Sequence, residues 1–362
     1  MEQKCICFFS GDITNSGGTE RVASVIANEL NKKKEYKISF LSLTEKKKEP
    51  FFQIDSDIKR DIVYDHVVRG MSHLMGIVGR VGKYIKKNDI DIIIDIDGIL
   101  DMYTLPNKLF RRVKVISWEH YNYYQHPFVS HRKYTRRMSA RWADAIVTLT
   151  EEDKGYYENN LKIRCPIRCI YNPVIWKNKL KEYDINSKMI LSVGRLTYQK
   201  GFDILVDVAN LFLKKYPDWK WVILGEGEDR DKLEQKILGC GLERQVILKG
   251  NVDNIDDYYS QAAMYVMTSR FEGLPMTLLE TKPFHLPLVS FNCKTGPSEL
   301  IDDGNNGFLI EDNDIKEMAE KIEVLINNEK LRNAFSEKSQ TGMERFELDS
   351  VVDKWDSVLK RL

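Results

Sequence analysis

Two glutamates, Glu272 and Glu280, stand eight residues apart, the first beside a Gly273-Leu274-Pro275 turn. Paired carboxylates are typical of glycosidases, in which the two groups flank the scissile bond at defined separations. If Glu280 is helical, a residue eight positions back lies ~12 Å away along the helix axis, too far for both carboxylates to serve one bond. We therefore set the glycosidase interpretation aside, and the spacing alone leaves the chemistry of the pair open.

A pair of cations follows the apolar run Met189–Val193, within the stretch GRLTYQKG at residues 194–201. Arg195 and Lys200 stand between two glycines, where a strand would end and a helix begin. A guanidinium hydrogen-bonds two phosphate oxygens at once and an ammonium acts as a point charge, so the two together suit a diphosphate. The stretch therefore favours a phosphate site over an ordinary surface loop.

Two glycine turns also follow predicted strands. Gly17 and Gly18 precede a helical pattern, where backbone N–H groups would be free to meet an anion. Gly225 and Gly227 follow the run Trp219–Leu224 and would let the backbone approach a ligand. A plain tight turn is an equally simple interpretation of either feature alone. Neither matches the G-x-G-x-x-G fingerprint, which disfavours a dinucleotide-binding oxidoreductase.

His120 follows another predicted strand, Val113–Trp118, so its side chain would project from the carboxyl end of the sheet. A histidine in this position can donate a hydrogen bond near a reacting centre, although many loop histidines have no such role.

The elements that must position these residues alternate regularly between strand and helix. In the first half we predict strands over Lys4–Ser10, Lys37–Leu43, Ile90–Ile96, Val113–Trp118, Ala145–Thr150 and Arg168–Tyr171, with helices over Glu20–Asn31 and Asp153–Asn159. In the second half we predict strands over Met189–Val193, Trp219–Leu224, Val246–Lys249, Met264–Met267 and Leu286–Phe291, and helices over Phe202–Lys215, Arg230–Leu238, Ile255–Ala262, Met276–Phe284 and Asp314–Asn327. This alternation predicts parallel sheets covered on both faces.

The chain is thus predicted to be α/β, with two Rossmann-like, doubly wound domains facing each other across a cleft, because ligands bind beyond the carboxyl ends of such strands. We place the first domain at residues 1–172 and the second at 173–345, with a charged linker over Lys177–Lys188. The amphipathic segment 346–362 is expected to form a helix that packs back on the first domain.

Composition limits the class of protein. The 362 residues are 43% hydrophobic and 30% charged, which is typical of a folded chain of two domains. No run approaches the ~18 apolar residues of a membrane helix, and the N-terminal run is too short for a signal peptide. The six cysteines form no C-x-x-C pair, which favours a reduced, cytoplasmic protein.

Charge is distributed unevenly along the chain. Residues 1–171 hold 29 Lys and Arg against 22 Asp and Glu, and much of the excess lies in residues 101–150. The basic residues of that segment are Lys108, Arg111, Arg112, Lys114, Arg132, Lys133, Arg136, Arg137 and Arg141. A solvated basic face and a surface for anionic membranes are equally good interpretations. Nucleic acid is disfavoured because no nucleic-acid-binding motif accompanies the segment.

Taken in chain order, these motifs resemble the retaining, nucleotide-sugar-dependent glycosyltransferases of GT-B fold known as family 4, which carry a Glu-x7-Glu motif. The resemblance covers nearly the whole chain, and the stretch Gly296-Pro297-Ser298-Glu299 is similar to enzymes that build bacterial surface polysaccharides. It implies transfer of a hexose or N-acetylhexosamine, with retention, from a nucleotide sugar that is commonly UDP-linked. The acceptor would be a glycan or a lipid-linked oligosaccharide, met in the cytoplasm or at the inner face of the membrane.

The resemblance also implies a role for each site residue. Arg195 and Lys200 would stabilise the diphosphate, Glu272 would bind the transferred sugar, Glu280 would bind the ribose, and His120 would lie near the anomeric carbon. The donor-binding backbone would come from Gly17, Gly18, Gly194, Gly225, Gly227, Gly273, Leu274, Pro275, Met276 and Thr277. No metal and no cofactor besides the donor is implied, because two cations and a helix N-terminus can neutralise the phosphates.

Two departures from the family pattern bear on the structure. After Glu280 the chain has Thr281-Lys282-Pro283 where many relatives have a small residue and a glycine, and Gly296-Pro297 stands where a pair of glycines is usual. The first leaves the end of the helix open, and the second makes Gly296 the expected close-approach residue, with Glu299 a minor candidate. The alternative function is a catalytically silent nucleotide-binding or scaffold protein, against which the intact set of charged residues speaks.

Overall fold

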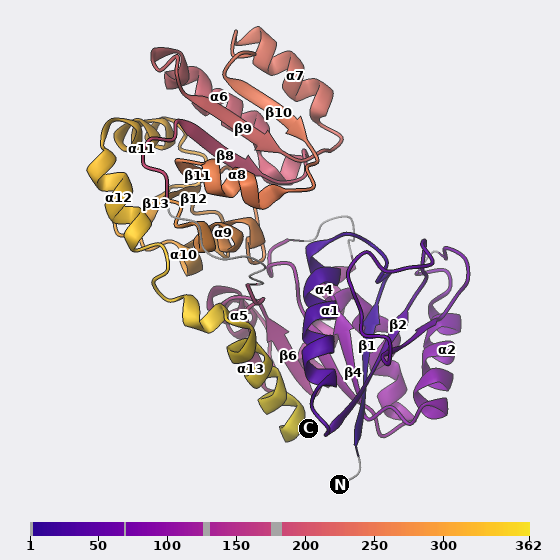
Figure 1. Cartoon of the computed structure of the whole chain (residues 1–362). Helices are drawn as coiled ribbons and strands as arrows, with labels where there is room; N and C mark the ends of the chain where they lie inside the picture. Colours follow the sequence, from indigo (N-terminus) through magenta and orange to yellow (C-terminus); the bar gives the residue numbers. More distant parts are fainter. Residues whose placement is uncertain (1–2, 69, 126–130, 175–182) are drawn as a thin grey trace. The chain divides into compact units, whose positions relative to one another are not determined.

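The structure is a computed structural model that describes residues 3–68, 70–125, 131–174 and 183–362. It divides into two compact units, Met1–Pro173 with Arg345–Leu362, and Val174–Glu344 (Figure 1). Residues 177–182 of the predicted linker lie outside the described residues.

The described part of the first unit is built on a seven-stranded sheet in which neighbouring strands are parallel. The strands are β1 (Lys4–Ser10), β2 (Tyr36–Ser42), β3 (Lys59–Ile62), β4 (Ile92–Ile96), β5 (Lys114–Trp118), β6 (Ala145–Thr148) and β7 (Ile167–Cys169). The helices are α1 (Gly18–Asn31), α2 (Leu74–Lys87), α3 (Asp101–Thr104), α4 (Arg132–Trp142), α5 (Glu151–Asn160) and α13 (Leu348–Arg361). The strand order is β3-β2-β1-β4-β5-β6-β7, so the winding reverses between β1 and β4.

The described part of the second unit has a six-stranded parallel sheet of order β10-β9-β8-β11-β12-β13. The strands are β8 (Met189–Val193), β9 (Lys220–Leu224), β10 (Val246–Gly250), β11 (Met264–Met267), β12 (Leu288–Phe291) and β13 (Gly307–Ile310). The helices are α6 (Phe202–Phe212), α7 (Arg230–Gly239), α8 (Ile255–Gln261), α9 (Met276–Thr281), α10 (Pro297–Leu300), α11 (Ile315–Asn327) and α12 (Glu329–Glu337). Here the winding reverses between β8 and β11.

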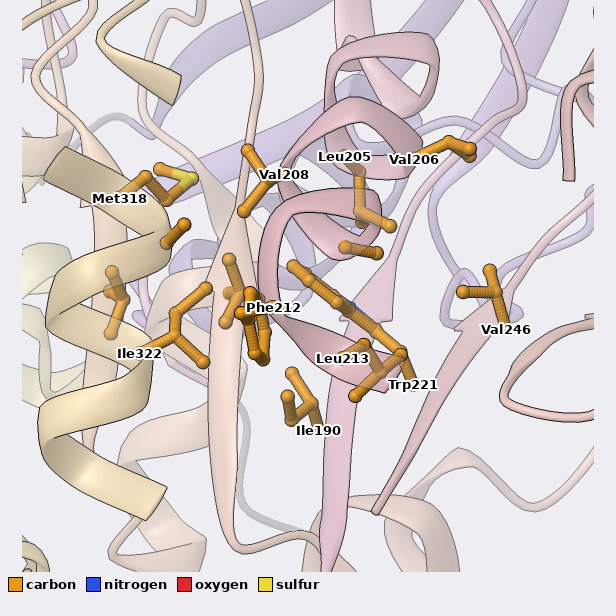
Figure 2. Packing of buried hydrophobic residues seen from close by; sticks show 14 of the residues in the cluster. Ile190, Leu205, Val206, Val208, Phe212, Leu213, Trp221, Val246, Met318 and Ile322 are labelled. Carbon is orange, nitrogen blue, oxygen red and sulfur yellow. The ribbon is translucent and has the colours of Figure 1, made fainter. Parts of the chain in front are cut away.

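The apolar runs explain both sheets. All five residues of β4 are buried, as expected for a central parallel strand covered on two faces. In the second unit, Phe212 of α6 packs against Trp221 of β9, and Met318 and Ile322 of α11 join the same cluster (Figure 2). The predicted pair of doubly wound α/β domains is therefore confirmed.

Helix α13 packs on the first unit, although it comes from the far end of the sequence (Figure 1). The hydroxyl of Tyr36 donates to Asp356 Oδ1 at 2.6 Å, and the ring of Trp355 meets that of Trp118 edge to face at 4.8 Å. These contacts explain why the apolar face of α13 is buried.

Candidate active site

The charged motifs of the second unit meet where its strand order reverses. Residues 194–201 follow β8 and residues 268–275 follow β11, and these two strands are neighbours in the sheet. Their carboxyl ends therefore bring the two loops together at the place where open parallel sheets bind ligands.

Hydrogen bonds join the two loops directly. The amide of Arg270 donates to the carbonyl of Gln199 at 2.8 Å, and the side-chain amide of Gln199 donates to the carbonyl of Phe271 at 3.2 Å. The hydroxyl of Thr268 donates to the carbonyl of Lys200 at 3.2 Å. Loop positions distant in sequence are thus fixed relative to each other before any ligand binds.

Arg270 extends this connection to the start of α6. Its guanidinium donates to both carboxylate oxygens of Asp203, at 2.9 and 2.6 Å, and lies 4.2 Å from the ring centroid of Tyr198. Although burial raises the pKa of Asp203, the hydrogen bonds from Arg270 outweigh it and the net shift is downward. The pair was not recognised from the sequence, although Arg270 stands two residues before Glu272.

The Nζ atom of Lys200 donates to Oε1 of Glu272 at 2.7 Å. The Glu272 side chain is 6% exposed and the Lys200 side chain 18% exposed. The sequence predicted different ligand groups for these two residues, and the structure shows that they are also partners of each other. Thr295 fixes the backbone here, because its hydroxyl donates to the Glu272 carbonyl at 2.7 Å.

Arg195 lies on the same loop but points to solvent. It is exposed, and within the described part of the chain its side chain makes no hydrogen bond or ion pair. Its cationic head is therefore available to a ligand.

The glycines around these loops make close backbone contacts. Gly225 has φ +130°, and a Cβ there would clash with the carbonyl of Gly194. A Cβ at Gly227 would clash with the backbone of Leu196. A Cβ on Gly194 itself would lie 3.1–3.2 Å from the methylenes of Lys200. The structure thus gives Gly194, Gly225 and Gly227 a packing role, and their predicted approach to a donor stays a prediction.

The turn from Gly273 to Thr277 leads into α9, whose N-cap is Pro275. Gly296 has φ +99°, and a Cβ there would clash with the Pro275 ring and lie 3.0 Å from the Gly273 carbonyl. The expected close approach at Gly296 is therefore to this turn. Leu274 is buried, whereas Met276 and Thr277 are partly exposed.

The helix that carries Glu280 is shorter than the sequence predicted. Instead of running to Phe284, α9 ends at Thr281 and is followed by a 3-10 turn over Lys282–Phe284. Pro283 has no N–H to continue the α-helical pattern, which explains the change. Glu280 is partly exposed, and its Oε2 accepts a hydrogen bond from the hydroxyl of Tyr259 at 3.2 Å.

In the first unit, the Gly17-Gly18 loop follows β1 and begins α1, with Gly17 as the N-cap. A Cβ on Gly18 would meet no atom within 4 Å, whereas one on Gly17 would clash with the carboxylate of Glu20. Open space therefore lies beside Gly18, as an approaching ligand would need. Glu20 in the first turn of α1 was not singled out from the sequence.

His120 follows β5. Its ring lies 4.5 Å from that of Trp118, and its Nε2 is buried without a hydrogen-bond partner among the described residues. Burial lowers the pKa of His120 to about 4, so the ring is neutral at pH 7. A neutral imidazole can donate a hydrogen bond to a ligand without adding charge.

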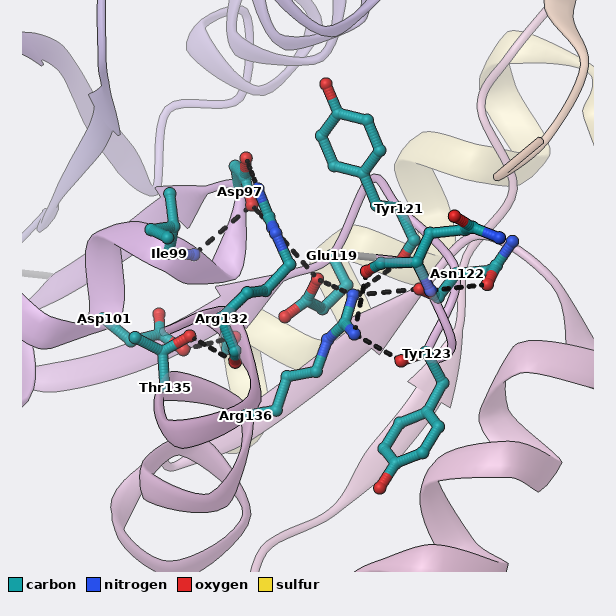
Figure 3. A network of polar contacts seen from close by, with 12 residues as sticks. Asp97, Ile99, Asp101, Glu119, Tyr121, Asn122, Tyr123, Arg132, Thr135 and Arg136 are labelled. Carbon is teal, nitrogen blue, oxygen red and sulfur yellow. Dashed lines mark hydrogen bonds and ion pairs between the residues drawn. The ribbon is translucent and has the colours of Figure 1, made fainter. Parts of the chain in front are cut away.

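The basic segment after His120 is not the surface patch that the sequence suggested. Arg132 and Arg136 are 3% and 1% exposed, and both belong to a buried polar network (Figure 3). Arg132 forms a bidentate pair with Asp97, and both arginines lie within 3.8 Å of Glu119. Lys108 pairs with Asp144. The exposed members are Arg112, Lys114, Lys133, Arg137 and Arg141.

Arg136 organises the loop that follows His120. Its guanidinium donates to the carbonyls of Tyr121, Asn122, Tyr123 and Gln125 (Figure 3). A charged side chain in the interior requires such partners, and four carbonyls with Glu119 supply them.

Among the described residues, no three or more His, Cys, Asp or Glu side chains gather in a way that could hold a metal ion. None of the helices in the described ranges is both long and apolar enough to cross a membrane.

Comparison with known proteins agrees with this geometry. Residues 16–175 match the family model "Glycosyltransferase Family 4", and residues 176–341 match "Glycosyl transferases group 1". An uncharacterised glycosyltransferase of Haemophilus influenzae is 34% identical over 98% of this chain and 100% of its own length. The chain belongs to the GT-B glycosyltransferases of the family 4 type.

Two further relatives of this glycosyltransferase extend the comparison. A Campylobacter jejuni protein is 26% identical over 94% of both chains, and is named an alpha-1,4-N-acetyl-D-galactosaminyltransferase acting on a diphospho-undecaprenol-linked glycan. The crystal structure of Staphylococcus aureus TarM, in complex with fondaparinux, alpha-GlcNAc-glycerol and UDP, superposes with a TM-score of 0.78 at 18% identity, covering 99% of both chains.

Proposed function

We propose that this glycosyltransferase moves a hexose or N-acetylhexosamine from a UDP-sugar to a glycan or lipid-linked acceptor, with retention of configuration, in bacterial surface polysaccharide synthesis. The observation that carries the proposal is the junction of the Arg195–Lys200 loop with the Glu272 loop at the strand-order reversal of the second unit. The names of the relatives, which include a lipid-linked acceptor and a UDP complex, agree with it.

The donor's diphosphate would bind to the cations of this junction. Arg195, which is exposed and unpaired within the described chain, would bind phosphate oxygens, and Lys200 would transfer part of its interaction from Glu272 to the phosphate. The backbone turn from Gly273 to Thr277 would meet the phosphate beside them. Positive charge placed there before the reaction stabilises the leaving group as its negative charge develops.

The two carboxylates would then bind the sugars at either side of the diphosphate. Once the donor engages Lys200, Glu272 could accept hydrogen bonds from hydroxyls of the transferred sugar, and Glu280 from the ribose hydroxyls. Tyr259, which donates to Glu280, orients that carboxylate.

The first unit would supply the acceptor side, with space beside Gly18 and the neutral ring of His120. With retention, we propose that the leaving phosphate itself takes the proton of the acceptor hydroxyl as the new bond forms. The chain's own groups would orient the reactants, and no metal would be needed to neutralise the phosphates.

The first test is a thermal-shift panel of UDP-glucose, UDP-galactose, UDP-GlcNAc, UDP-GalNAc and a GDP-sugar, with and without EDTA. A donor at 100 times its dissociation constant stabilises the fold by ~2.7 kcal/mol. Transfer to a lipid-linked glycan, with the product anomer assigned by NMR, then tests retention. A silent nucleotide-binding protein would show the thermal shift but neither transfer nor donor hydrolysis.

Membrane association, if it supports the lipid-linked acceptor, would use α2 rather than the buried arginines. The exposed side chains on and before α2 combine Met71 and Met75 with Arg80, Lys83 and Lys87, and α2 contains no acidic residue. Cations beside apolar side chains suit an anionic bilayer surface, each cation adding ~1 kcal/mol.

Binding to anionic liposomes tests this surface. Lys83→Ser with Lys87→Ser should reduce partitioning, and Lys133→Ser with Arg137→Ser on α4 provides the matched control. Loss in the control alone would return the contact to the basic segment, and loss in neither would remove the membrane contact from the proposal.

A further inference from the structure

A cavity of about 380 Å³ lies in the first unit, between the edge strand β7 and α13. It is lined by Arg168 from β7 and by Lys354 and Arg361 from α13, with Glu151 at the start of α5. None of these residues belongs to the proposed donor site, so the cavity is a separate feature of the fold.

The three cations of the cavity have no carboxylate partner in the part of the chain that the structure describes. Arg168 donates to the carbonyl of Ile167 at 3.0 Å, and Lys354 Nζ lies 5.3 Å from the centroid of the Tyr171 ring. Arg361 makes no hydrogen bond or ion pair with a described residue. The one acid of the lining, Glu151, is paired with Lys154 at 3.0 Å.

This arrangement leaves a concave surface with an uncompensated positive charge. Three like charges around one hollow repel each other, and a hollow with low-dielectric walls concentrates their field on whatever enters. An anion that contacts all three would remove the repulsion. Two guanidinium groups and an ammonium, supplied from two elements, match the several oxygens of a phosphate better than the two oxygens of a carboxylate.

The remaining wall is largely apolar, with Ile170 and Val358 among its side chains. A volume of this size lies within the range of small-ligand pockets, which combine an apolar lining with a few polar groups that fix orientation. A bare inorganic ion would leave the apolar wall uncovered. The ligand that fits both parts is an anion with an apolar portion.

We propose that the cavity between β7 and α13 binds a phosphate ester that carries a small apolar group. The ester oxygens contact Arg168, Lys354 and Arg361, and the apolar group covers Ile170 and Val358. The same chemistry occurs in the headgroup region of an anionic phospholipid and in a soluble organic phosphate.

Isothermal titration of the full chain with three probes tests the proposal: phenyl phosphate, dihexanoyl phosphatidylglycerol below its micelle concentration, and inorganic phosphate. Both esters should bind saturably, and inorganic phosphate should bind about 10-fold more weakly because it covers no apolar surface. Tighter binding of the lipid identifies a headgroup site, and tighter binding of phenyl phosphate identifies a soluble ligand. No saturable binding of either ester at about 10 mM, a concentration that detects even weak sites, overturns the proposal.

Matched variants place the binding in this cavity. Arg168→Ser with Arg361→Ser should weaken ester binding at least about 10-fold, because two charge-assisted contacts are lost. Arg112→Ser with Arg164→Ser changes the net charge equally at exposed arginines of the same unit outside the lining, and should leave binding within about 2-fold. An equal loss in the two double variants would overturn the assignment.

Hydrogen exchange on the unaltered chain gives a second readout that does not depend on how the variants fold. Saturating ester should slow amide exchange in α13 and β7, the two elements that the ligand would join, and leave the second unit unchanged. Binding without protection of α13 would place the ligand elsewhere and overturn the proposal. The experiment uses no glycosyl transfer, so its failure leaves the proposed function untouched.

Discussion

Lys200 Nζ lies 2.7 Å from Oε1 of Glu272 across 72 residues of sequence, which joins the loop after β8 to the loop after β11. The contact shows that a cation suited to phosphate and a carboxylate suited to sugar hydroxyls form one buried pair when no ligand is bound. Donor binding would therefore exchange this pair for two contacts with the ligand. The exchange avoids an unpaired buried charge in either state.

Loss of the cation should be expensive for the reaction. We expect Lys200→Ala to lower kcat/KM for transfer at least about 100-fold, because removal of one preorganised charge-stabilising group costs about 3 kcal/mol of transition-state stabilisation. Initial rates with the donor found in the thermal-shift panel measure this. Near-normal turnover would remove Lys200 from the phosphate site.

The double variant Lys200→Met with Glu272→Gln separates folding from catalysis. Lys200→Met alone should reduce the free energy of unfolding by about 1–3 kcal/mol, since it leaves the Glu272 carboxylate buried without its partner. Adding Glu272→Gln should restore much of that stability while transfer stays low. Urea unfolding measures both, and equal stability of the single and double variants would show that the pair matters little to the fold.

Two adjacent arginines on α4 should respond in opposite ways to the same substitution. Arg136 is buried and donates to the carbonyls of the loop after His120, whereas Arg137 is exposed. Arg136→Ser should destabilise the fold by about 3 kcal/mol or more, because Glu119 and the loop carbonyls lose their partner. Arg137→Ser should change stability by about 0.5 kcal/mol or less. Similar thermal denaturation of the two variants would contradict the network.

This contrast marks the limit of what the sequence could predict. Apolar runs and the order of motifs predicted the doubly wound sheets and the loops that carry Arg195, Lys200 and Glu272. A list of charges in sequence order, however, does not distinguish Arg136 from Arg137. Their environments differ because α4 turns one toward the loop and the other toward solvent, which depends on tertiary packing.

Two elements of the first unit were missed for local reasons. Strand β3 has the sequence KRDI, with no apolar run, because it lies at the sheet edge. Helix α2 contains Gly76, Gly79 and Gly82, and glycine lowers helix propensity by roughly 1 kcal/mol each. A Cβ at Gly82 would clash with the side chain of Asn107, so the packing requires what local propensity disfavours.

The buried acids of β4 and α3 predict an unusual dependence of stability on pH. Asp95 and Asp101 are fully buried, with Thr104 donating to Asp95 and Ser117 donating to Asp101. Burial raises the pKa of both, that of Asp101 to about 7. The folded state then holds more protons than the unfolded state between about pH 4 and 7, so these groups stabilise the fold below pH 4 and that contribution falls as pH rises.

We therefore expect Asp95→Asn to gain stability relative to the unaltered protein as pH rises from 5 to 7. The slope should be at most about 1.4 kcal/mol per pH unit for one retained proton. Urea unfolding at pH 5, 6 and 7 measures it, with the exposed Asp89→Asn as a control that should follow the unaltered protein. Parallel profiles for Asp95→Asn and the unaltered protein would show that the pair holds no extra proton.

The pair Arg270 and Asp203 should affect donor binding more than folding. Its bidentate hydrogen bonds hold the loop that carries Lys200 against the loop that carries Glu272, yet Asp203 is 48% exposed, so the pair should contribute only about 0.5–1 kcal/mol to stability. We expect Asp203→Asn to raise KM for the donor about 10-fold, because a misplaced loop weakens contacts to the phosphate.

Asp207 provides the control on the same helix, one turn further along α6. It forms an ion pair with Lys236 at 2.7 Å that touches neither loop, so Asp207→Asn should cost similar stability and leave donor KM unchanged. Steady-state kinetics with varied donor, alongside thermal denaturation, separates the two effects. If both variants raise KM equally, loop position does not depend on Arg270; if only Asp203→Asn does, the bidentate pair positions Lys200 and Glu272 for the donor.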